Sequence, residues 1–243
     1  SVQAVADTIR DIVADRATMD SPPNDLLDML LAARDEEGNQ LSDTQLLDEM
    51  MGIVFAGHET TALTLSWATY LLATHPEIQA ALQQEVDTVL GGRPATTEDL
   101  NHLPLTRAVV METMRLYPAA WITTREGLGA DSIDGYALPP KALILINIYG
   151  LHRSPDYWET PDDFNPQRFI EESNYPKGAY LPFGAGPRKC IGEPLALMEA
   201  QLILATLMQQ ASVQLDSAHP VTPFPQFTLR SKNGVWVNLT PRS

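Results

Sequence analysis

Apolar residues recur at spacings of three and four along the first part of the chain, which is the pattern of helices that bury one face. The pattern extends over residues 2–13 and again over residues 26–31, and the pair Pro22 and Pro23 separates the two segments. It predicts two short amphipathic helices at the start of the chain.

A much longer helix is predicted from Ser42. Ser42 and Gln45, in the run SDTQ, form a capping-box signature. The helical pattern continues to His75 and Pro76, which makes a helix of about 30 residues and about 45 Å. It is apolar on nearly all sides, so we expect it to cross the middle of a domain. Ionisable residues interrupt it, and the uncharged run after Glu59 is shorter than the ~20 residues that a membrane span needs.

Three further helices and several strands are expected. Proline positions and a closing Gly-Gly pair predict helices over residues 76–90 and 104–117, and a third helix follows over residues 193–210. After Pro118 the runs WITTRE and ALILIN read as strands, and the last thirty or so residues read as two or three more. We therefore expect a mainly α fold with small β-sheets.

Composition narrows the possible functions. The 243 residues suffice for one substantial core, and a formal charge of -15 disfavours binding to nucleic acid. A single cysteine excludes an internal disulfide framework and any multi-cysteine metal site. The chain begins at Ser1 with a helical pattern already under way, so we expect that the N-terminal part of a longer protein precedes it.

The single cysteine, Cys190, lies in the run FGAGPRKCIG. A lone cysteine is most often a small buried apolar residue. Here Arg188, Lys189 and the predicted start of a helix favour the thiolate, which is the form that binds metals and attacks substrates. A covalent role would need a base such as His152 or His102, and neither is close in sequence. The glycines of the run allow the backbone to approach a flat ligand closely.

The spacing F-x-x-G-x-R-x-C-x-G resembles the signature of the cytochromes P-450, the haem-thiolate monooxygenases. It is formed by Phe183, Gly186, Arg188, Cys190 and Gly192. The resemblance implies the C-terminal portion of the cytochrome P-450 fold, with haem b as cofactor. Cys190 would be the axial ligand of the iron, Arg188 would pair with a haem propionate and Phe183 would pack beside the sulfur.

The run AGHETTAL, within the long helix, contains residues that lower the stability of a buried helix. Gly57 disfavours the helix by up to ~1 kcal/mol relative to Ala, and a polar notch alone leaves Glu59 without a purpose. The run resembles the family motif A-G-x-[DE]-T-[TS]. By that resemblance Thr60 would hydrogen-bond to dioxygen and a water, Glu59 would relay protons, and Ala56 and Gly57 would allow close approach of substrate and dioxygen.

Glu112 and Arg115 are three positions apart and share one face of a predicted helix. The pair alone is a weak motif, but its place in ETMRLYP is similar to that of the family's E-x-x-R motif. Arg168, in FNPQRF, resembles the arginine that completes a buried triad, although Gln167 stands where Glu is more common. The resemblance assigns the three charges to folding and haem retention.

Two further positions are assigned by resemblance. Arg125, in WITTREG, lies where the family often has a second propionate-binding arginine; the alternative is a solvated strand arginine. Residues 119–122 lie where the substrate pocket is usually lined, which implies an apolar substrate. His152, in LHRSP, lies where haem-side contacts also occur in the family, but it is expected to be structural.

The resemblance covers residues 1–243 as the C-terminal half of a single haem-binding domain whose N-terminal half is absent. It implies a monooxygenase that uses dioxygen and electrons from a ferredoxin or flavin reductase, docked near Arg188 and Lys189. A non-catalytic haem-binding or interaction fragment is the alternative, and an enzyme that rearranges peroxides is disfavoured by the intact Glu59 and Thr60 pair. A cytoplasmic location is expected, with a membrane anchor in the absent part left open.

Overall fold

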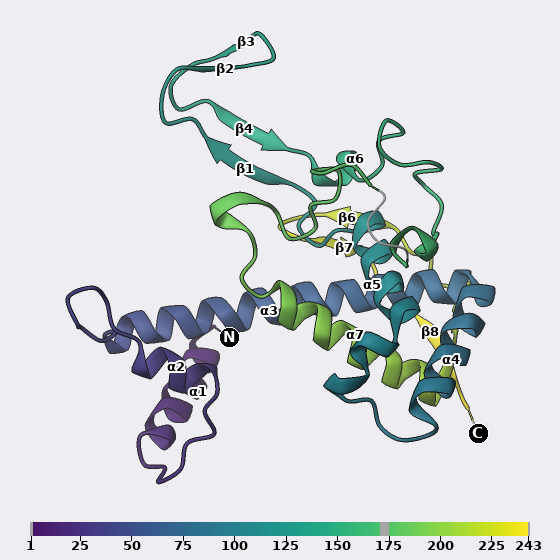
Figure 1. Cartoon of the computed structure of the whole chain (residues 1–243), viewed down its shortest axis with the longest axis horizontal. Coiled ribbons are helices and arrows are strands. Elements are labelled where there is room, and N and C mark those ends of the chain that lie inside the picture. Colours follow the sequence, from purple (N-terminus) through teal and green to yellow (C-terminus); the bar gives the residue numbers. More distant parts are fainter. Residues whose placement is uncertain (1, 171–174, 243) are drawn as a thin grey trace. The chain divides into compact units, whose positions relative to one another are not determined.

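The computed structural model describes residues 2–170 and 175–242 (Figure 1). Its contacts divide the chain into two compact units, Ser1–Glu59 and Thr60–Ser243, here called unit 1 and unit 2. The long helix α3, Asp43–Thr74, contains the boundary between them.

Unit 1 holds the two short helices that the sequence predicts, α1 (Val2–Arg16) and α2 (Leu26–Ala32). Arg16 joins them, because its Nη1 lies 2.7 Å from Asp25 Oδ1 and 2.6 Å from Asp28 Oδ1. The Asp25 and Asp28 side chains also form the capping box that begins α2. A small set of apolar side chains is buried in this unit: Ala6, Ile9, Leu27 and Leu46.

Helix α3 begins and ends as predicted. Ser42 N–H donates to Gln45 Oε1 over 2.9 Å, and Gln45 N–H donates to Ser42 Oγ over 3.3 Å, which is the predicted capping box. In unit 1 the apolar residues Ile53, Val54 and Phe55 of the helix are exposed, so the expectation that the whole helix crosses the middle of a domain stays a prediction. Most of the buried side chains of α3 lie in unit 2, between Thr61 and Leu72, and Leu46 is buried in unit 1.

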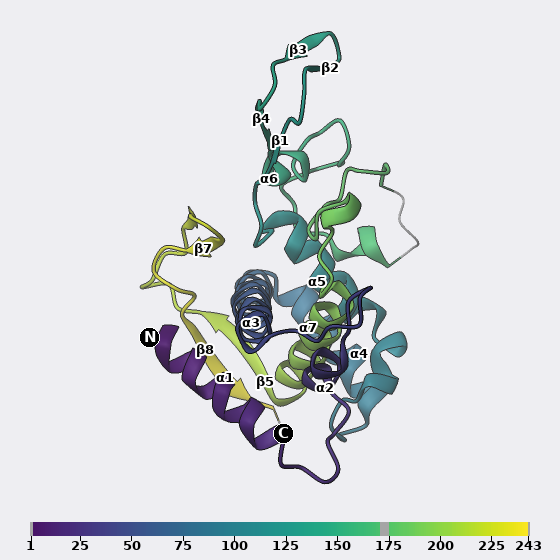
Figure 2. The ribbon, with the colours of Figure 1, turned by 90° about the vertical axis from the view of Figure 1, so that its left-hand side faces the viewer.

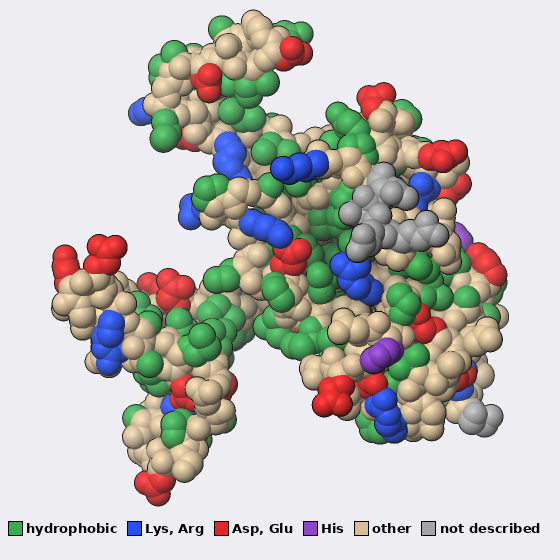
Figure 3. Space-filling view, in the orientation of Figure 1, with side chains coloured by type: hydrophobic (Ala, Val, Ile, Leu, Met, Phe, Trp, Pro, Cys, Tyr) green, Lys and Arg blue, Asp and Glu red, His purple; other side chains and the backbone are tan. Residues whose placement is uncertain are grey.

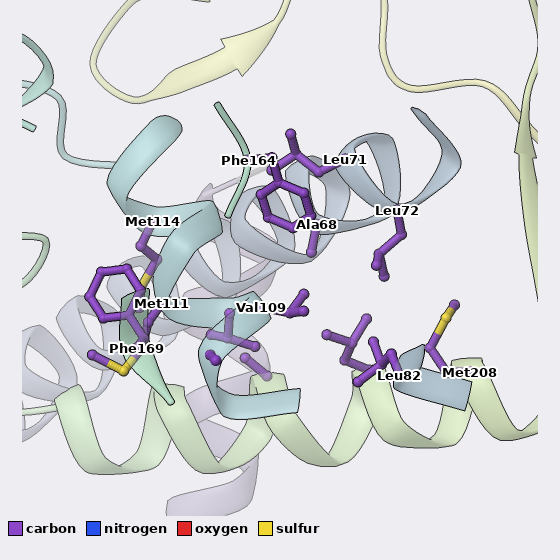
Figure 4. Packing of buried hydrophobic residues seen from close by; sticks show 14 of the residues in the cluster. Ala68, Leu71, Leu72, Leu82, Val109, Met111, Met114, Phe164, Phe169 and Met208 are labelled. Atoms are coloured by element: carbon purple, nitrogen blue, oxygen red, sulfur yellow. The ribbon is translucent and has the colours of Figure 1, made fainter. Parts of the chain in front are cut away.

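The core of unit 2 lies among four helical segments. They are the second part of α3, α4 (Pro76–Leu90), α5 (Pro104–Leu116) and α7 (Glu193–Gln210). Figure 4 shows the packing of side chains from these helices together with Phe164 and Phe169 from the irregular segment that follows. The helix bounds match the predicted ones within a residue or two, and Gly91 ends α4 with a left-handed φ of 56°.

Within residues 2–170 and 175–242, the strands pair in four separate two-stranded antiparallel sheets. β1 (Thr123–Glu126) pairs with β4 (Leu143–Ile146), and β2 (Asp131–Ile133) pairs with β3 (Tyr136–Leu138). β5 (Ala211–Leu215) pairs with β8 (Val237–Pro241), and β6 (Pro223–Pro225) pairs with β7 (Leu229–Ser231). Figures 1 and 2 show the β2–β3 pair at the tip of a long hairpin whose base is the β1–β4 pair. The predicted mainly α fold with small sheets is confirmed.

Short helical turns connect these elements. They are η1 (Thr97–His102), α6 (Ile148–Leu151), η2 (Pro166–Phe169) and η3 (Gly186–Arg188). The proline-rich segment around η2 is irregular, as predicted, but Trp158, Phe164 and Phe169 anchor it by burying their rings. Among the described residues, no helix combines the length and the apolar character that crossing a membrane requires.

Candidate functional site

The loop from Phe183 to Cys190, here called the Cys loop, is closed by a backbone hydrogen bond. Cys190 N–H donates to the Phe183 carbonyl over 2.9 Å, so the two ends of the loop are held together. Gly184 and Gly186 have φ angles of 71° and 73°, in the left-handed region where a side chain would be strained. Gly186 of the sequence motif and its neighbour Gly184 are therefore required by the shape of the loop, whereas Gly192 has a φ of -82° that any residue can adopt.

Cys190 is exposed, three residues before α7 begins at Glu193. Cys190 is therefore not the buried apolar residue that a lone cysteine most often is. Lys189 Nζ lies 2.5 Å from Glu193 Oε2, and Ile191, next to the cysteine, is 97% exposed.

A cleft of about 380 Å³ lies beside the Cys loop in unit 2. Met111 and Arg107 of α5 line one side, and Phe183 and Lys189 of the Cys loop line another. The Cys190 side chain is therefore accessible from solvent, and part of the loop backbone is accessible from the cleft.

Glu112 and Arg115 form a fully buried ion pair on α5. The guanidinium donates twice to the carboxylate, from Nε to Oε2 over 2.6 Å and from Nη2 to Oε1 over 2.8 Å. Both side chains have an exposed fraction of 0%. A buried charge is tolerated only when it is paired and hydrogen-bonded, and here both conditions are met.

The same pair anchors the irregular segment before the Cys loop. Arg115 donates to the carbonyls of His152, Pro161 and Asp163 over 2.8, 2.6 and 3.0 Å. Arg168 Nε lies 3.4 Å from Glu112 Oε1, and its Nη2 donates to the Thr160 carbonyl over 2.9 Å. The three charges identified in the sequence are therefore brought together.

Arg125 lies on β1, and its side chain is exposed. The Arg125 Nη1 donates to the neighbouring Thr124 carbonyl over 2.8 Å, and the guanidinium lies at the protein surface. Arg188, in η3, is also exposed. Figure 3 shows several Lys and Arg side chains on the face of unit 2 that is in view.

The residues of the AGHETT run lie on consecutive positions of α3. Ala56, Gly57 and Glu59 belong to unit 1 and Thr60 is the first residue of unit 2. The Thr64 hydroxyl donates to the Thr60 carbonyl over 3.0 Å, one turn further along. The helix continues through the run without interruption.

The stretch expected to line a substrate pocket, residues 119–122, is attached to the C-terminal hairpin. Leu229 N–H donates to the Ala119 carbonyl over 3.0 Å, and the Trp121 indole donates to the Gln226 carbonyl over 2.8 Å. Phe227, between those two hairpin residues, is 95% exposed.

The sequence does not reveal how His152 is bonded. Its ring is fully buried and bonds to residues 37 and 29 positions away, Arg115 and Leu181. Burial lowers the pKa of His152 to about 4. No local pattern could predict this, because both partners are distant in sequence.

The Cys loop fits a flat cofactor that takes one thiolate ligand. The described residues hold no group of three His, Cys, Asp or Glu side chains placed to bind a metal ion, whereas haem iron needs only one axial ligand from the protein. Cys190 is exposed, and a Cβ added at Gly184 or Gly186 would meet no atom within 4 Å, so the surface there is open. A single thiolate on an open, glycine-containing surface is the donor that haem-thiolate ligation requires.

Comparison with known proteins identifies the family of the chain. The model of the family described as Cytochrome P-450 matches residues 1–237. The chain is 38% identical over 241 residues to pentalenene oxygenase of Streptomyces avermitilis, covering 98% of this chain and 53% of that protein. It is 40% identical over 217 residues to cyclooctatin synthase of Streptomyces melanosporofaciens, covering 88% of this chain and 47% of that protein.

A solved structure, the cytochrome P450DA heme domain, superposes with a TM-score of 0.91 at 28% identity. The superposition covers 99% of this chain and 54% of that one. The chain thus spans about half the length of the curated relatives and of the solved structure that it matches.

Proposed function

Because the chain belongs to the cytochrome P-450 family, we propose that it is the haem-binding part of a monooxygenase. The enzyme would insert one atom of dioxygen into an apolar small molecule. The observation that carries the proposal is the exposed Cys190 in a closed, glycine-containing loop at the start of α7. The proposed domain comprises residues 1–243 as the C-terminal half of one haem-binding unit.

In this proposal Cys190 is the axial ligand of haem b. When bound, haem supplies the oxygen-activating chemistry, and thiolate ligation favours cleavage of the O–O bond. Arg188 and Arg125, both exposed, would each pair with a propionate. Phe183 would pack beside the sulfur. Gly186 has no side chain, so a flat ligand could approach the backbone closely there.

Glu59 and Thr60 would supply protons. The Thr60 hydroxyl both accepts and donates hydrogen bonds, so it can hold dioxygen and a water, and the Glu59 carboxylate can pass protons to that hydroxyl. Ala56 and Gly57 have small side chains or none, which would leave room for the substrate beside the helix. A cytoplasmic location is part of the same proposal.

The charge cluster of Glu112, Arg115 and Arg168 would retain haem without contacting it. Support comes from its bonds to the irregular segment that leads to the Cys loop. Since the cluster is buried, it can hold that segment in place while the exposed face of the Cys loop remains free for the cofactor.

The proposed substrate class rests on the name of a relative, and the proposed electron donor rests on the exposed cations beside the Cys loop. One relative is named for the oxygenation of the small molecule pentalenene, and we extend to this chain only the class of an apolar substrate. The electrons would come from a ferredoxin or flavin reductase. An acidic donor surface could dock beside the exposed cations Arg188 and Lys189, despite the net charge of -15.

The experiment that tests thiolate ligation is an absorption spectrum of the haem-loaded protein, reduced and exposed to carbon monoxide. We expect a strongly red-shifted Soret band, because the axial ligand is a thiolate. The Cys190→Ala variant should lack that band. A band unchanged by this substitution, or no haem uptake by the parent protein, would refute the proposal.

The proton-relay role is tested separately with Thr60→Ala. Loss of the hydroxyl should uncouple electron consumption from product formation, so that a larger share of the electrons yields peroxide or water. Thr69→Ala, further along the same helix, is the control and should leave coupling unchanged. Equal coupling in Thr60→Ala and the parent protein would contradict the relay.

A second candidate is a haem-binding or interaction fragment without catalysis of its own. The chain spans about half the length of its relatives, and large apolar side chains such as Leu143 and Ile191 are exposed. This candidate predicts haem uptake that depends on Cys190 but no product from any apolar substrate until the other half of the domain is supplied as a second chain.

A further inference from the structure

His152 is bonded to Arg115 through both its backbone and its ring. The Arg115 guanidinium donates to the His152 carbonyl over 2.8 Å, and His152 Nδ1 lies 3.2 Å from the Arg115 carbonyl oxygen. The ring is fully buried. The position of His152 is therefore set by the buried ion pair of α5.

The other ring nitrogen bonds to the chain that enters the Cys loop. Leu181 N–H donates to His152 Nε2 over 2.8 Å. A carbonyl can only accept and a backbone N–H can only donate, so Nδ1 must carry the proton and Nε2 must be bare. Only this neutral tautomer satisfies both partners.

Leu181 is placed directly before the Cys loop. Pro182, which follows, has no N–H. The Leu181 carbonyl accepts from Gly184 N–H over 3.0 Å, and the Phe183 carbonyl accepts from Cys190 N–H over 2.9 Å. A short series of contacts therefore leads from the Glu112 and Arg115 pair through His152 to the backbone of the cysteine.

We propose that His152 is a positioning residue for the cysteine ligand. Its Nε2 accepts the hydrogen bond from Leu181 N–H, and this bond fixes the start of the Cys loop relative to α5. The inference rests on the proposed role of Cys190. His152 acts through the backbone and contacts neither the sulfur nor a substrate.

The same geometry makes the link sensitive to acid. Protonation would place an N–H on Nε2 facing the Leu181 N–H, so two donors would oppose each other. The charged groups nearest the ring are Arg115 and the neighbouring Arg153, both of which oppose a second positive charge, and Glu112, which is already paired with Arg115. The Tyr180 ring, stacked at 5.2 Å, adds no charge while its phenol is neutral.

Two substitutions separate the bond from the packing of the ring. In His152→Gln the side-chain oxygen can replace Nε2 as acceptor for Leu181. In His152→Asn the side-chain nitrogen can replace Nδ1 as donor to Arg115, but nothing reaches Leu181. Both variants lose the ring, and both retain the backbone bond from Arg115 to residue 152.

Hydrogen exchange in the haem-loaded protein is the first measurement. The Leu181 amide should exchange roughly ten- to a hundredfold faster in His152→Asn than in His152→Gln, because a buried donor is left unpaired. The second measurement is the decay of the red-shifted Soret band at neutral pH, which should be several-fold faster in His152→Asn. Equal behaviour of the two variants would reduce His152 to a packing role and overturn the proposal.

The remaining outcomes are also decisive. A difference in Leu181 exchange without a difference in band decay would show that the bond does not position the cysteine, which overturns the proposal. If His152→Asn does not fold, the parent protein is titrated instead: Leu181 exchange, corrected for its intrinsic pH dependence, should accelerate below about pH 4, and a flat profile would contradict the link. Failure of the proposed function is distinct, because a band unchanged in Cys190→Ala would leave the exchange difference at Leu181 intact.

Discussion

Arg115 is a cation with no exposed surface, and it is stabilised by five hydrogen bonds from its guanidinium. Two go to Glu112 and three to backbone carbonyls. Its electrostatic and its architectural roles cannot be separated, because the same group neutralises a buried carboxylate and holds the irregular segment. The residue therefore matters far more than an exposed ion pair at the same spacing, which contributes about 0 to 1 kcal/mol.

Arg115→Ala should give protein without haem and lower the free energy of unfolding by about 3–5 kcal/mol, since it leaves Glu112 buried with an incomplete set of partners. Haem content and denaturant unfolding are the measurements. Arg107→Ala, an exposed arginine on the same helix, is the control and should change unfolding little. Normal haem content in Arg115→Ala would contradict the assignment.

Individual residues differ in how far the sequence reveals them. The spacing around Cys190 predicts its chemistry, because a ligand, its cation and its glycines lie within ten residues. Helical spacing predicts that Glu112 and Arg115 share a face, but their burial is expected only from the family resemblance, since it depends on elements that follow much later in the chain. His152 is expected only to be structural, and its two partners appear only in the folded chain.

At the scale of elements, α5 begins without a side-chain cap from its own N-cap residue, Leu103. Glu85 of α4 provides one instead. Its carboxylate accepts from Leu105 N–H over 2.7 Å, from Thr106 N–H over 2.8 Å and from the Thr106 hydroxyl over 2.7 Å. An anion at this end also complements the helix dipole. The helix that carries the buried ion pair is thus started by its neighbour.

Glu85→Ala should lower the free energy of unfolding by about 1–2 kcal/mol, because two N–H groups at the start of α5 lose their acceptor. Chemical denaturation of the parent and the variant measures the difference. The exposed Glu199 on α7 provides the matched control, since Glu199→Ala removes the same charge from a helix interior. Equal losses in the two variants would mean that charge, and not capping, is responsible.

Element bounds are the most predictable part of this fold. The capping box at Ser42, the prolines at positions 76 and 104 and the glycine at position 91 are local signals, and each stands where a helix begins or ends. Burial is less predictable. The apolar character of α3 suggests a core helix throughout, yet Ile53, Val54 and Phe55 are exposed, because sequence pattern does not tell which neighbours are present to cover a face.

At the scale of the whole molecule, apolar exposure is the main liability. Leu143 and Leu145 of β4 point outward and are 66% and 59% exposed, while Ile144 between them is half-buried. Contiguous apolar surface of this kind promotes association. The net charge of -15 opposes it through repulsion between molecules.

Replacing Leu143 and Leu145 together with Thr should lower the binding of a dye specific for apolar surfaces and reduce light scattering, with little change in the melting temperature. Thr is compatible with a strand, and the two side chains bury little area. Ile144→Thr is the matched control and should lower the melting temperature while leaving dye binding nearly unchanged. Undiminished dye binding in the double variant would mean that the dye binds to apolar surface other than Leu143 and Leu145.

The Trp67 indole donates to the Leu229 carbonyl over 3.0 Å, 162 positions later. Gln79 likewise exchanges hydrogen bonds with Val213 across 134 positions. During synthesis the helices that carry Trp67 and Gln79 leave the ribosome long before Val213 and Leu229 are made. The side-chain donors of Trp67 and Gln79 therefore lack these acceptors until the end of the chain is synthesised. Nascent chains that stop short of residue 229 would therefore remain substrates for chaperones and proteases, even though Cys190 has already been made.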